Sequence, residues 1–463
     1  MSLKDDEQQN IQMELDFSSA LTGEAREAGR EGTESPGATS GPESPASTNR
    51  LMEEVCEREN LMAALQQVKA NKGSPGVDGM TVGGITDYLK QHWPAIREQL
   101  LSGTYEPKPV RRVEIPKPDG AGVRKLGIPS VLDRFIQQAV LQVLQRRWDR
   151  TFSDYSYGFR PGRSAHQAVA QAQQYIAEGY GWCIDFDLEK FFDRVNHDKL
   201  MGQIARRVED KRLLKLIRAF LNAGVMENGL VSPSVEGTPQ GGPLSPLLSN
   251  LVLDELDREL ERRRHRFVRY ADDCNIYVRS ERAGQRVMES VARFITQKLK
   301  LKVNETKSAV ARPQERKFLG FSFSTGPEVK RVIAPKALDR FKRRVREITR
   351  RAKGVSIETT IEELAPYMRG WRSYFGFCET PEVLIGLTRW VRLRLRAALW
   401  RQWKTPRRRR AALLELGVRP RLASNTAGSG LGPWYLAKAK ALSVGLSNAY
   451  FKSLGLPSLF EEC

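Results

Sequence analysis

The sequence predicts an α+β domain followed by a basic helical region. Helix-like and strand-like patterns alternate from Leu51 to about Phe323, whereas strand patterns fade beyond Pro335. The chain has 463 residues, enough for about three domains of ordinary size. Its 75 Lys and Arg residues outnumber 55 Asp and Glu residues, and the resulting net charge of +20 favours a polyanionic partner.

The first 50 residues differ in composition from the rest of the chain. They hold ten acidic and four basic residues and are rich in Ser, Gly, Pro and Thr, which predicts a disordered tail. Removing this net charge of −6 from the total of +20 leaves +26 on residues 51–463. Two interpretations of the tail stay open, a shield for basic surface and an inert extension.

Cysteine usage and hydropathy exclude several classes of protein. The five cysteines are scattered and form no CxxC pair, so the sequence indicates neither a disulfide framework nor a zinc ribbon. We find no run of about 18 apolar residues and no secretory signal pattern at the N-terminus. We therefore expect a cytoplasmic protein without a membrane partner.

Local patterns predict the individual elements. Leu51, Val55, Leu61, Leu65 and Val68 follow a helical period that ends at Asn71-Lys-Gly73. Further along, the patterns predict a strand at 110–116, a glycine-containing loop at 117–122, a helix at 132–144, and basic helices at 336–353 and 381–403.

The segment from Trp182 to Asp193 is rich in acidic residues. Trp182, Ile184, Phe186 and Leu188 alternate with Cys183, Asp185, Asp187 and Glu189, so a strand here has an apolar face and an acidic face. Carboxylates gathered at a strand end repel one another, and a divalent cation relieves that repulsion. A strand with one solvated acidic face gives the same pattern, so both interpretations stay open at this point.

A second acidic pair lies in the segment from Arg266 to Val278. Two strand-like runs flank Ala271-Asp-Asp273, which predicts a β-hairpin with the aspartates at its turn. Asp is also a common turn former, so the pair alone does not define a site. Carboxylates from two different strands, however, can together hold two divalent cations.

These motifs resemble those of reverse transcriptases. Tyr270-Ala-Asp-Asp273 lies in an aromatic hairpin, and Asp187 precedes Phe192 by five residues. More narrowly, the chain resembles bacterial group II intron-encoded reverse transcriptases from about residue 51 to 403, and the segments that carry this resemblance are 159–166, 236–246, 301–308, 318–321 and the maturase-like 370–375.

The resemblance implies a right-hand polymerase fold and a division into domains. We expect an acidic tail over 1–50, fingers and palm over 51–330, a helical thumb or maturase (X) domain over 331–403, and a short DNA-binding segment over 404–463. The four histidines lie upstream of this last segment and no cysteine pair is present, so we expect no HNH endonuclease.

The resemblance also implies the site residues. The catalytic carboxylates are Asp187, Asp272 and Asp273, and two Mg²⁺ ions, with Mn²⁺ as a substitute, are bound by Asp187, Asp272 and the main chain of Leu188. Asp185 is expected to be structural, because no aromatic residue follows it five positions later. The residues expected to contact the deoxynucleoside triphosphate are Lys117, Arg124, Phe192, Gln240 and Lys307. A core role for Phe192 and incidental surface roles for Lys117 and Arg124 are the alternatives.

Basic residues are expected to contact nucleic acid. From Glu382 to Arg410 there are ten Lys or Arg residues and one acidic residue, and Lys336 to Lys353 holds nine and two. A face of one charge beside an apolar stripe favours a helix lying along phosphates, since a generic solvated helix mixes both signs. The expected contacts are Arg160, Arg163, Arg343, Arg346, Arg407, Arg408, Arg409 and Arg410.

The predicted function is that of an RNA-directed DNA polymerase that binds its group II intron RNA, promotes splicing and copies the intron during retrohoming. Its expected partners are the intron RNA, an RNA template with a DNA or RNA primer, deoxynucleoside triphosphates and target DNA. The alternatives are a related bacterial reverse transcriptase recruited to defence or DNA repair, and an RNA-binding splicing cofactor with a vestigial polymerase.

Overall fold

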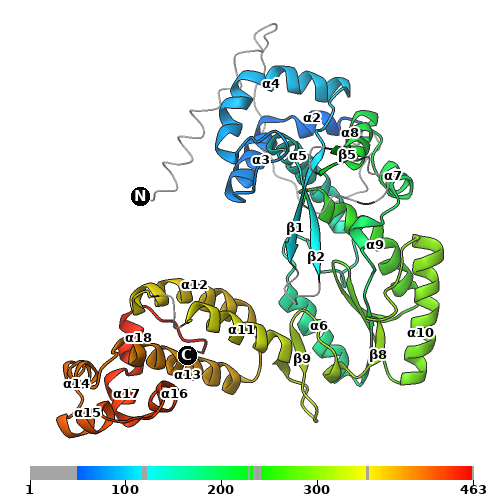
Figure 1. Ribbon diagram of the computed structural model, residues 1–463. Coiled ribbons are helices and arrows are strands. Elements are labelled where there is room, and N and C mark those ends of the chain that lie inside the picture. Colours follow the sequence, from blue (N-terminus) through cyan, green and yellow to red (C-terminus); the bar gives the residue numbers. More distant parts are fainter. Residues whose placement is uncertain are drawn as a thin grey trace, which may run out of the picture. The chain divides into compact units, whose positions relative to one another are not determined.

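The computed structural model describes residues 49–116, 122–227, 230–232, 237, 241–350 and 354–460. The chain divides into two compact units, each of which is built from separate stretches of sequence (Figure 1). The first unit holds the described residues up to Ser164 together with Phe186–Cys274 and Arg286–Ala309. The second unit holds Ala165–Asp185, Asn275–Gln285 and the described residues from Val310 onward.

Helices form most of the first unit. They are α2 (Leu51–Val55), α3 (Arg58–Ala70), α4 (Ile85–Ser102), α5 (Val131–Trp148), α7 (His197–Ala205), α8 (Lys211–Asn222) and α9 (Ser245–Arg262), with short 3-10 turns η2 (Val82–Gly84), η3 (Asp149–Thr151) and η4 (Phe191–Asp193). Helix α5 is buried along most of its length and packs against α2 and α3 (Figure 1). Ser130 begins α5 by accepting a hydrogen bond from the Asp133 amide, as expected of an N-cap serine.

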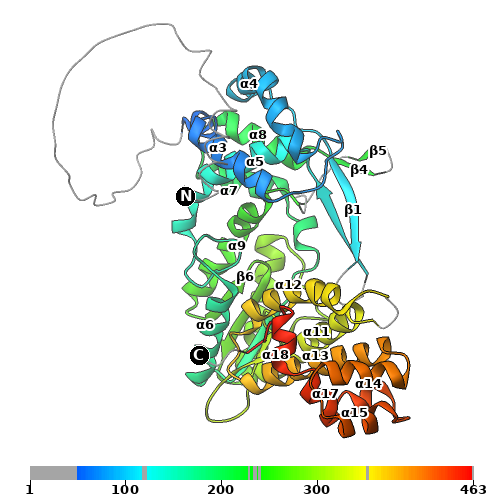
Figure 2. The same ribbon diagram turned by 90° about the vertical axis from the view of Figure 1, so that its left-hand side faces the viewer.

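A four-stranded sheet extends from these helices. Its strands are β1 (Val110–Pro116), β2 (Val123–Ile128), β4 (Val225–Glu227) and β5 (Leu230–Ser232), in the order β2-β1-β4-β5 (Figure 2). Strand β1 is antiparallel to β2, with Ile115 opposite Arg124, and parallel to β4. The loop between β1 and β2 lies outside the described residues.

A second four-stranded sheet carries the acidic motifs. Its strands are β3 (Trp182–Phe186), β6 (Arg266–Tyr270), β7 (Asp273–Val278) and β8 (Ala309–Ala311), in the order β6-β7-β3-β8. The division into units falls within β3, after Asp185, and within β7, after Cys274. Helix α10 (Glu281–Phe294) and the π-helical turn η5 (Ile295–Leu299) lie between β7 and β8 in the sequence.

The second unit becomes helical after a short hairpin. It contains α6 (Ala165–Ala177), the 3-10 turn η6 (Pro313–Glu315), β9 (Phe321–Phe323), β10 (Arg331–Ile333), α11 (Pro335–Ile348), α12 (Ile357–Phe375), α13 (Pro381–Gln402), α14 (Pro406–Glu415), α15 (Pro420–Ala427), α16 (Pro433–Leu436), α17 (Lys440–Gly445) and α18 (Asn448–Ser453). Trp371 packs 4.6 Å from the Phe341 ring and 4.7 Å from the Phe375 ring, which joins α11 to α12. Helices α14, α15 and α17 pack together (Figure 1).

The structure confirms the fold class in its broad form, a mixed α+β part followed by a helical part. The strand at 110–116 has the predicted limits, and the helix predicted at 381–403 ends one residue earlier. The helix predicted at 132–144 is longer, since Ser130 caps it so that it begins one residue earlier, at Val131, and apolar residues continue to Trp148. The predicted acidic tail lies outside the described residues up to position 48. Among the described helices, none combines the length and apolarity needed to cross a membrane.

Candidate active site

The two aspartates of the hairpin lie where β6 turns into β7. Tyr270 ends β6, Ala271 and Asp272 make the turn, and Asp273 begins β7. Ala271 has φ +57°, a left-handed conformation that non-glycine residues seldom adopt and that is concentrated at functional sites. Ala271 is buried, Asp272 is half-buried and Asp273 is exposed, so the turn presents carboxylates on a fixed backbone.

Gly158 lies against this turn. A Cβ atom at position 158 would stand 2.3 Å from the Ala271 nitrogen and 2.9 Å from the Tyr270 carbonyl carbon. The Asn250 amide donates a 2.8 Å hydrogen bond to the Gly158 carbonyl, which fixes that approach. Only glycine fits between Asn250 and the turn without moving the backbone.

Asp187 follows the end of β3 and is held by the segment that ends at Ser308. Its amide donates to Ser308 Oγ at 3.0 Å, and its carbonyl accepts from the Asn304 amide at 2.8 Å. Lys307 Nζ lies 3.4 Å from Asp187 Oδ2, and the lysine side chain is 62% exposed. The structure therefore brings Asp187 and Lys307, two of the predicted site residues, together. Because the lysine side chain is exposed, it can also reach another anionic group. Leu188, also predicted, is buried and forms an isolated antiparallel bridge to Val303.

The two acidic motifs lie at the ends of neighbouring strands. Strand β7 is hydrogen-bonded to β3, and both Phe186 and the Asp273–Cys274 end of β7 belong to the first unit. The carboxylates of Asp187, Asp272 and Asp273 therefore belong to one compact body.

The donor set of this pair of strand ends fits a hard cation, because carboxylate and main-chain oxygens are the ligands that Mg²⁺ prefers. Within the described part of the chain, no group of three or more His, Cys, Asp or Glu side chains is arranged to hold a metal ion. Mg²⁺ in nucleotide enzymes is typically bound by one or two carboxylates, with substrate phosphates and water completing the shell.

Asp185 has a different environment from Asp187. Arg316 donates to Asp185 Oδ2 through both Nε, at 3.0 Å, and Nη2, at 2.6 Å. This ion pair accounts for the acidic residue on β3 without a metal ion, so Asp185 and Asp187, two residues apart, are distinguished by their partners.

Phe191 and Phe192 lie in the 3-10 turn η4 and differ in burial. Phe191 is 3% exposed, whereas Phe192 is half-buried, and their rings lie edge to face at 5.2 Å. A Cβ at Gly237, which has φ +90°, would lie 2.8 Å from the Phe192 carbonyl oxygen. His197 Nε2 lies 2.6 Å from the Gly237 carbonyl, so a buried imidazole holds the chain against the turn that carries Phe192.

Three residues expected at the nucleotide have no described side chain. Lys117 and Gln240 lie outside the described residues. Arg124 is described as backbone in β2, opposite Ile115, at the end of the strand that borders the β1–β2 loop. Their roles remain predictions.

The two arginines of the 159–166 motif behave differently. Arg160 is 8% exposed and donates to Asp149 Oδ1 at 2.9 Å and to the carbonyls of Ser153 and Ser156. The expectation that Arg160 contacts nucleic acid is not supported by this geometry, because its guanidinium is enclosed and used within the fold. Arg163 is partly exposed, and its Nη2 lies 2.6 Å from Asp154 Oδ1.

The predicted basic residues of the second unit lie at its surface. Arg343 and Arg346 are exposed on α11, and the Arg346 guanidinium lies 5.6 Å from the Trp390 ring. Arg407 to Arg410 occupy the first turn of α14, where Arg409 is half-buried over the Trp400 ring at 4.7 Å and the other three are exposed. No carboxylate among the described residues forms an ion pair with these four arginines.

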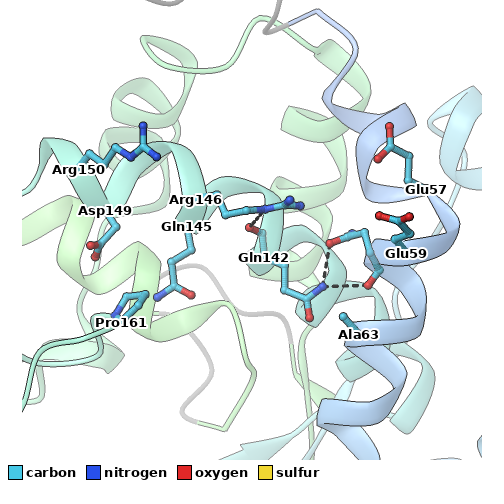
Figure 3. A pocket seen from close by; sticks show the side chains of 10 residues that line it. Glu57, Glu59, Ala63, Gln142, Gln145, Arg146, Asp149, Arg150 and Pro161 are labelled. Carbon is cyan, nitrogen blue, oxygen red and sulfur yellow. Dashed lines mark hydrogen bonds between the residues drawn. The ribbon is translucent and has the colours of Figure 1, made fainter. Parts of the chain in front are cut away.

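A cavity of about 580 Å³ lies elsewhere in the first unit (Figure 3). Helices α3 and α5, the η3 turn and Pro161 form its walls, and its lining side chains are mostly polar. None of the predicted catalytic or nucleotide-contacting residues lines it. Asp149 at its edge is the partner of Arg160, so one wall continues into the buried ion pair.

Sequence reasoning missed the residues that support the turn at Ala271 and Asp272. Gly158, Asn250 and Arg269 surround it, and His197 holds the Gly237 backbone. Arg269 stands next to Tyr270 within the motif, but nothing in the local sequence distinguishes a buried arginine from an exposed one.

Comparisons with known proteins agree with the motifs. Residues 115–323 match the family model described as reverse transcriptase (RNA-dependent DNA polymerase), and residues 338–414 match the group II intron, maturase-specific domain. "Protein YkfC" of Escherichia coli is 40% identical over 220 residues, covering 46% of this chain and 58% of the relative. "Group II intron-encoded protein LtrA" of Lactococcus lactis is 30% identical over 337 residues, covering 59% of this chain and 56% of the relative.

A chain of the solved "Partial Cas6-RT-Cas1--Cas2 complex" matches with a TM-score of 0.35 and 24% identity, over 53% of this chain and 42% of that chain. At this score the likeness supports no conclusion.

Together the two matched segments place a region of the reverse transcriptase family before a group II intron maturase-specific domain. The chain belongs to the group II intron reverse transcriptase/maturase family. It spans somewhat more than half of the length of these two curated relatives.

Proposed function

We propose that the protein is an RNA-directed DNA polymerase that also binds group II intron RNA to promote splicing and copies that RNA during retrohoming. The observation that carries the proposal is the position of Asp187 and Asp272 at the ends of hydrogen-bonded strands within one compact unit. Nucleotidyl transfer requires carboxylates from two separate strands, and family membership supplies the template and product classes.

The proposed chemistry assigns each side chain a task. Asp187, Asp272 and the main chain of Leu188 hold two Mg²⁺ ions, with Asp273 as a less direct contributor and Mn²⁺ as a substitute. When bound, the ions activate a primer 3′-hydroxyl and stabilise the pyrophosphate leaving group.

The nucleotide is held by residues around this pair. Lys307, 3.4 Å from Asp187 in the structure, turns its exposed ammonium toward the phosphates of an incoming nucleotide. Lys117, Arg124 and Gln240 are proposed to grip the triphosphate and the base. Phe192, the half-buried member of its aromatic pair, lies under the deoxyribose and excludes a 2′-hydroxyl.

The first turn of α14 supports the proposal that RNA binds the second unit. A helix N-terminus carries partial positive charge and is stabilised by acidic residues. Here Arg407 to Arg410 occupy that turn and no acidic residue does, an arrangement that works against the helix. Phosphates would supply the missing negative charge to the arginines and to the positive end of the helix. Target DNA is a proposed ligand of the remaining segment up to 463.

The decisive test substitutes Asp187→Asn and Asp272→Asn separately in the full chain. Each should lower primer extension on an RNA template by several orders of magnitude, because each removes a charged ligand from a site that depends on Mg²⁺. Affinity for group II intron RNA, measured by filter binding, should stay within about twofold because the arginines remain.

Asp185→Asn is the matched control, since this acid lies two residues before Asp187 but pairs with Arg316. Its rate of DNA synthesis, referred to folded protein, should stay close to that of the unmodified chain. Full polymerase activity in Asp187→Asn would overturn the proposed site, and loss of intron RNA binding by folded Asp187→Asn would overturn the separation of the two functions.

A further inference from the structure

Arg269 is buried within β6, two residues before the turn. Its side chain is 1% exposed and all of its guanidinium nitrogens donate hydrogen bonds. The acceptors are Asp257 Oδ1 at 2.7 Å, Asp257 Oδ2 at 2.6 Å, Asn250 Oδ1 at 3.0 Å, Ser156 Oγ at 2.7 Å and the Ala271 carbonyl at 2.9 Å. The last of these bonds reaches the residue that immediately precedes Asp272.

The surroundings fix this guanidinium in one position. Burial opposes the positive charge, but the attraction of Asp257 outweighs it and raises the pKa of Arg269, so the residue stays charged. The planar fork meets both carboxylate oxygens of Asp257, which lies on α9 and is fully buried. A lysine would keep the charge but lose this bidentate geometry and most of the donors.

The backbone of Arg269 is held as firmly as its side chain. Its amide donates to the Tyr155 carbonyl at 2.9 Å, and its carbonyl accepts from the Tyr157 amide at 2.9 Å. Asn250, which receives one guanidinium bond, donates to the Gly158 carbonyl, and Gly158 abuts Ala271. The left-handed Ala271 is thus held by its own carbonyl and by the chain that packs against it.

We propose that Arg269 is a positioning residue for the catalytic turn. Through Ala271 it fixes the direction in which Asp272 leaves β6, and Asp257 and Asn250 fix Arg269 in turn. This inference rests on the proposed polymerase function, because the position of Asp272 affects the reaction rate only if Asp272 takes part in nucleotidyl transfer. A shift of about 1 Å in a reacting geometry is enough to lower a rate about 100-fold.

The test uses Arg269→Lys and Asp257→Asn in the full chain, with primer extension followed as a function of Mg²⁺ and deoxynucleotide concentration. Rates are referred to the folded fraction, measured by circular dichroism at the assay temperature. We expect kcat to fall about 10-fold to 100-fold and the Mg²⁺ concentration for half-maximal rate to rise at least about threefold. Deoxynucleotide KM and intron RNA affinity should change by less than about twofold, because neither substitution removes a residue proposed to contact these ligands.

Asp254→Asn is the matched control. This acid lies three residues before Asp257 on α9, is 3% exposed, and pairs with Arg207 at 3.0 Å and Arg258 at 2.9 Å. None of its recorded bonds reaches the turn, so its substitution should lower stability without altering kcat or the Mg²⁺ requirement of the folded protein.

Ser156→Ala supplies a variant that keeps the ion pair and removes one acceptor from the same guanidinium. It keeps the proposal testable if Arg269→Lys and Asp257→Asn fold poorly, and its expected effect is a rise in the Mg²⁺ requirement smaller than that of Arg269→Lys.

The outcomes separate this inference from the proposed function. If Asp187→Asn abolishes synthesis while folded Arg269→Lys, or Ser156→Ala in its place, keeps the normal kcat and Mg²⁺ requirement, the positioning role is wrong and the polymerase stands. If Asp187→Asn leaves synthesis intact, the proposed function itself fails. An equal effect of Asp254→Asn on the Mg²⁺ requirement would show a general response to buried charge loss and would also overturn the positioning role.

Discussion

Arg160 and Arg269 of the first unit and the arginines at the start of helix α14 have opposite kinds of surroundings. Arg160 and Arg269 are enclosed, each is paired with an aspartate, and their donors meet carbonyl or side-chain oxygens of the fold. The first turn of α14 instead groups Arg407 to Arg410 without an acidic partner among the described residues, at the helix end where positive charge is unfavourable. The same residue type stabilises the fold through buried ion pairs in one region and carries a charge without an acidic partner in the other.

The difference shows how net charge should be interpreted in this protein. Enclosed arginines add to the count of basic residues, but their charge is cancelled inside the fold and offers nothing to a polyanion. We expect the exposed set on α14 and α11 to supply the field that attracts phosphates. The sign of the whole chain therefore predicts the class of partner, whereas the pairing of each arginine predicts where that partner would bind.

The largest expected effect comes from removing an enclosed arginine. Arg160→Ala should lower the free energy of unfolding by about 3–5 kcal/mol, because it leaves Asp149 without its partner and removes the guanidinium hydrogen bonds to the Ser153 and Ser156 carbonyls. Urea titration followed by circular dichroism measures the change. Arg163→Ala, three residues away at a partly exposed ion pair, should cost less than about 1 kcal/mol. Equal costs for the two variants would remove the distinction between enclosed and surface arginines within this motif.

The aromatic pair of η4 extends the comparison to apolar side chains. Phe191→Ala should cost about 3–5 kcal/mol of unfolding free energy as a core truncation, with little change in sugar selection. Phe192→Val should instead raise incorporation of ribonucleotides relative to deoxynucleotides strongly, because the ring no longer blocks the 2′-hydroxyl. Competitive primer extension with both nucleotide types measures the ratio. If Phe192→Val still rejects ribonucleotides like the unmodified chain, Phe192 belongs with Phe191 in the core.

Replacing Arg407 to Arg410 together with Ala should change binding far more than stability. Each phosphate contact that is lost lowers the slope of log affinity against log salt by roughly 0.7–0.9, because fewer counterions are released. Binding to structured intron RNA over a salt series measures the slope. Replacement of exposed Arg262, which pairs with Glu259 at 2.7 Å, is the control and should leave the slope unchanged. An unaltered slope in the α14 variant would mean that these arginines do not contact phosphate.

The smallest effect that we expect is a gain in the stability of α14, and it tests the electrostatic argument most directly. Arg408→Glu would place an acid three residues after the N-cap Thr405, whose side chain already accepts from the Arg408 amide at 3.3 Å. The resulting capping box and the favourable helix dipole should raise the stability of α14 by about 0.5–1 kcal/mol. RNA affinity should fall in the same variant, so the unfolding midpoint and the dissociation constant move in opposite directions. A variant that is less stable and binds RNA equally well would contradict both parts of the electrostatic argument.

The strand ends and the hairpin could be predicted from sequence because their signals are local. Alternating apolar residues from Trp182 define β3, and Tyr270-Ala-Asp-Asp273 between two strand-like runs defines the turn. Proline and the helical period likewise set the limits of α13 at Pro381–Gln402. The aspartates of the two motifs, Phe192 and Lys307 were selected by motif, and their chemical roles remain predictions.

The support around the site could not be predicted, because it depends on residues far apart in the sequence. Arg266 and Arg269 lie on the same strand, yet one is exposed and the other is buried. Burial of Arg269 is tolerated because its partners come from two other places in the chain, Asn250 and Asp257 from helix α9 and Ser156 from the segment after η3. The same limit applies to Arg160 and Arg163, because nothing in their shared motif indicates that the first is buried and the second is partly exposed.

The guanidinium of Arg269 also has a consequence for the order of folding. The hairpin β6–β7 joins residues adjacent in sequence, so its pairing can form early, whereas the bond from Arg269 to Ser156 closes a separation of 113 residues. Desolvating the arginine without its partners would carry a large cost, so we expect the packing of β6 against α9 and the Ser156 segment to follow the pairing of the hairpin. A chain that has collapsed but not yet assembled these distant parts would hold both acidic motifs and still lack a formed catalytic turn.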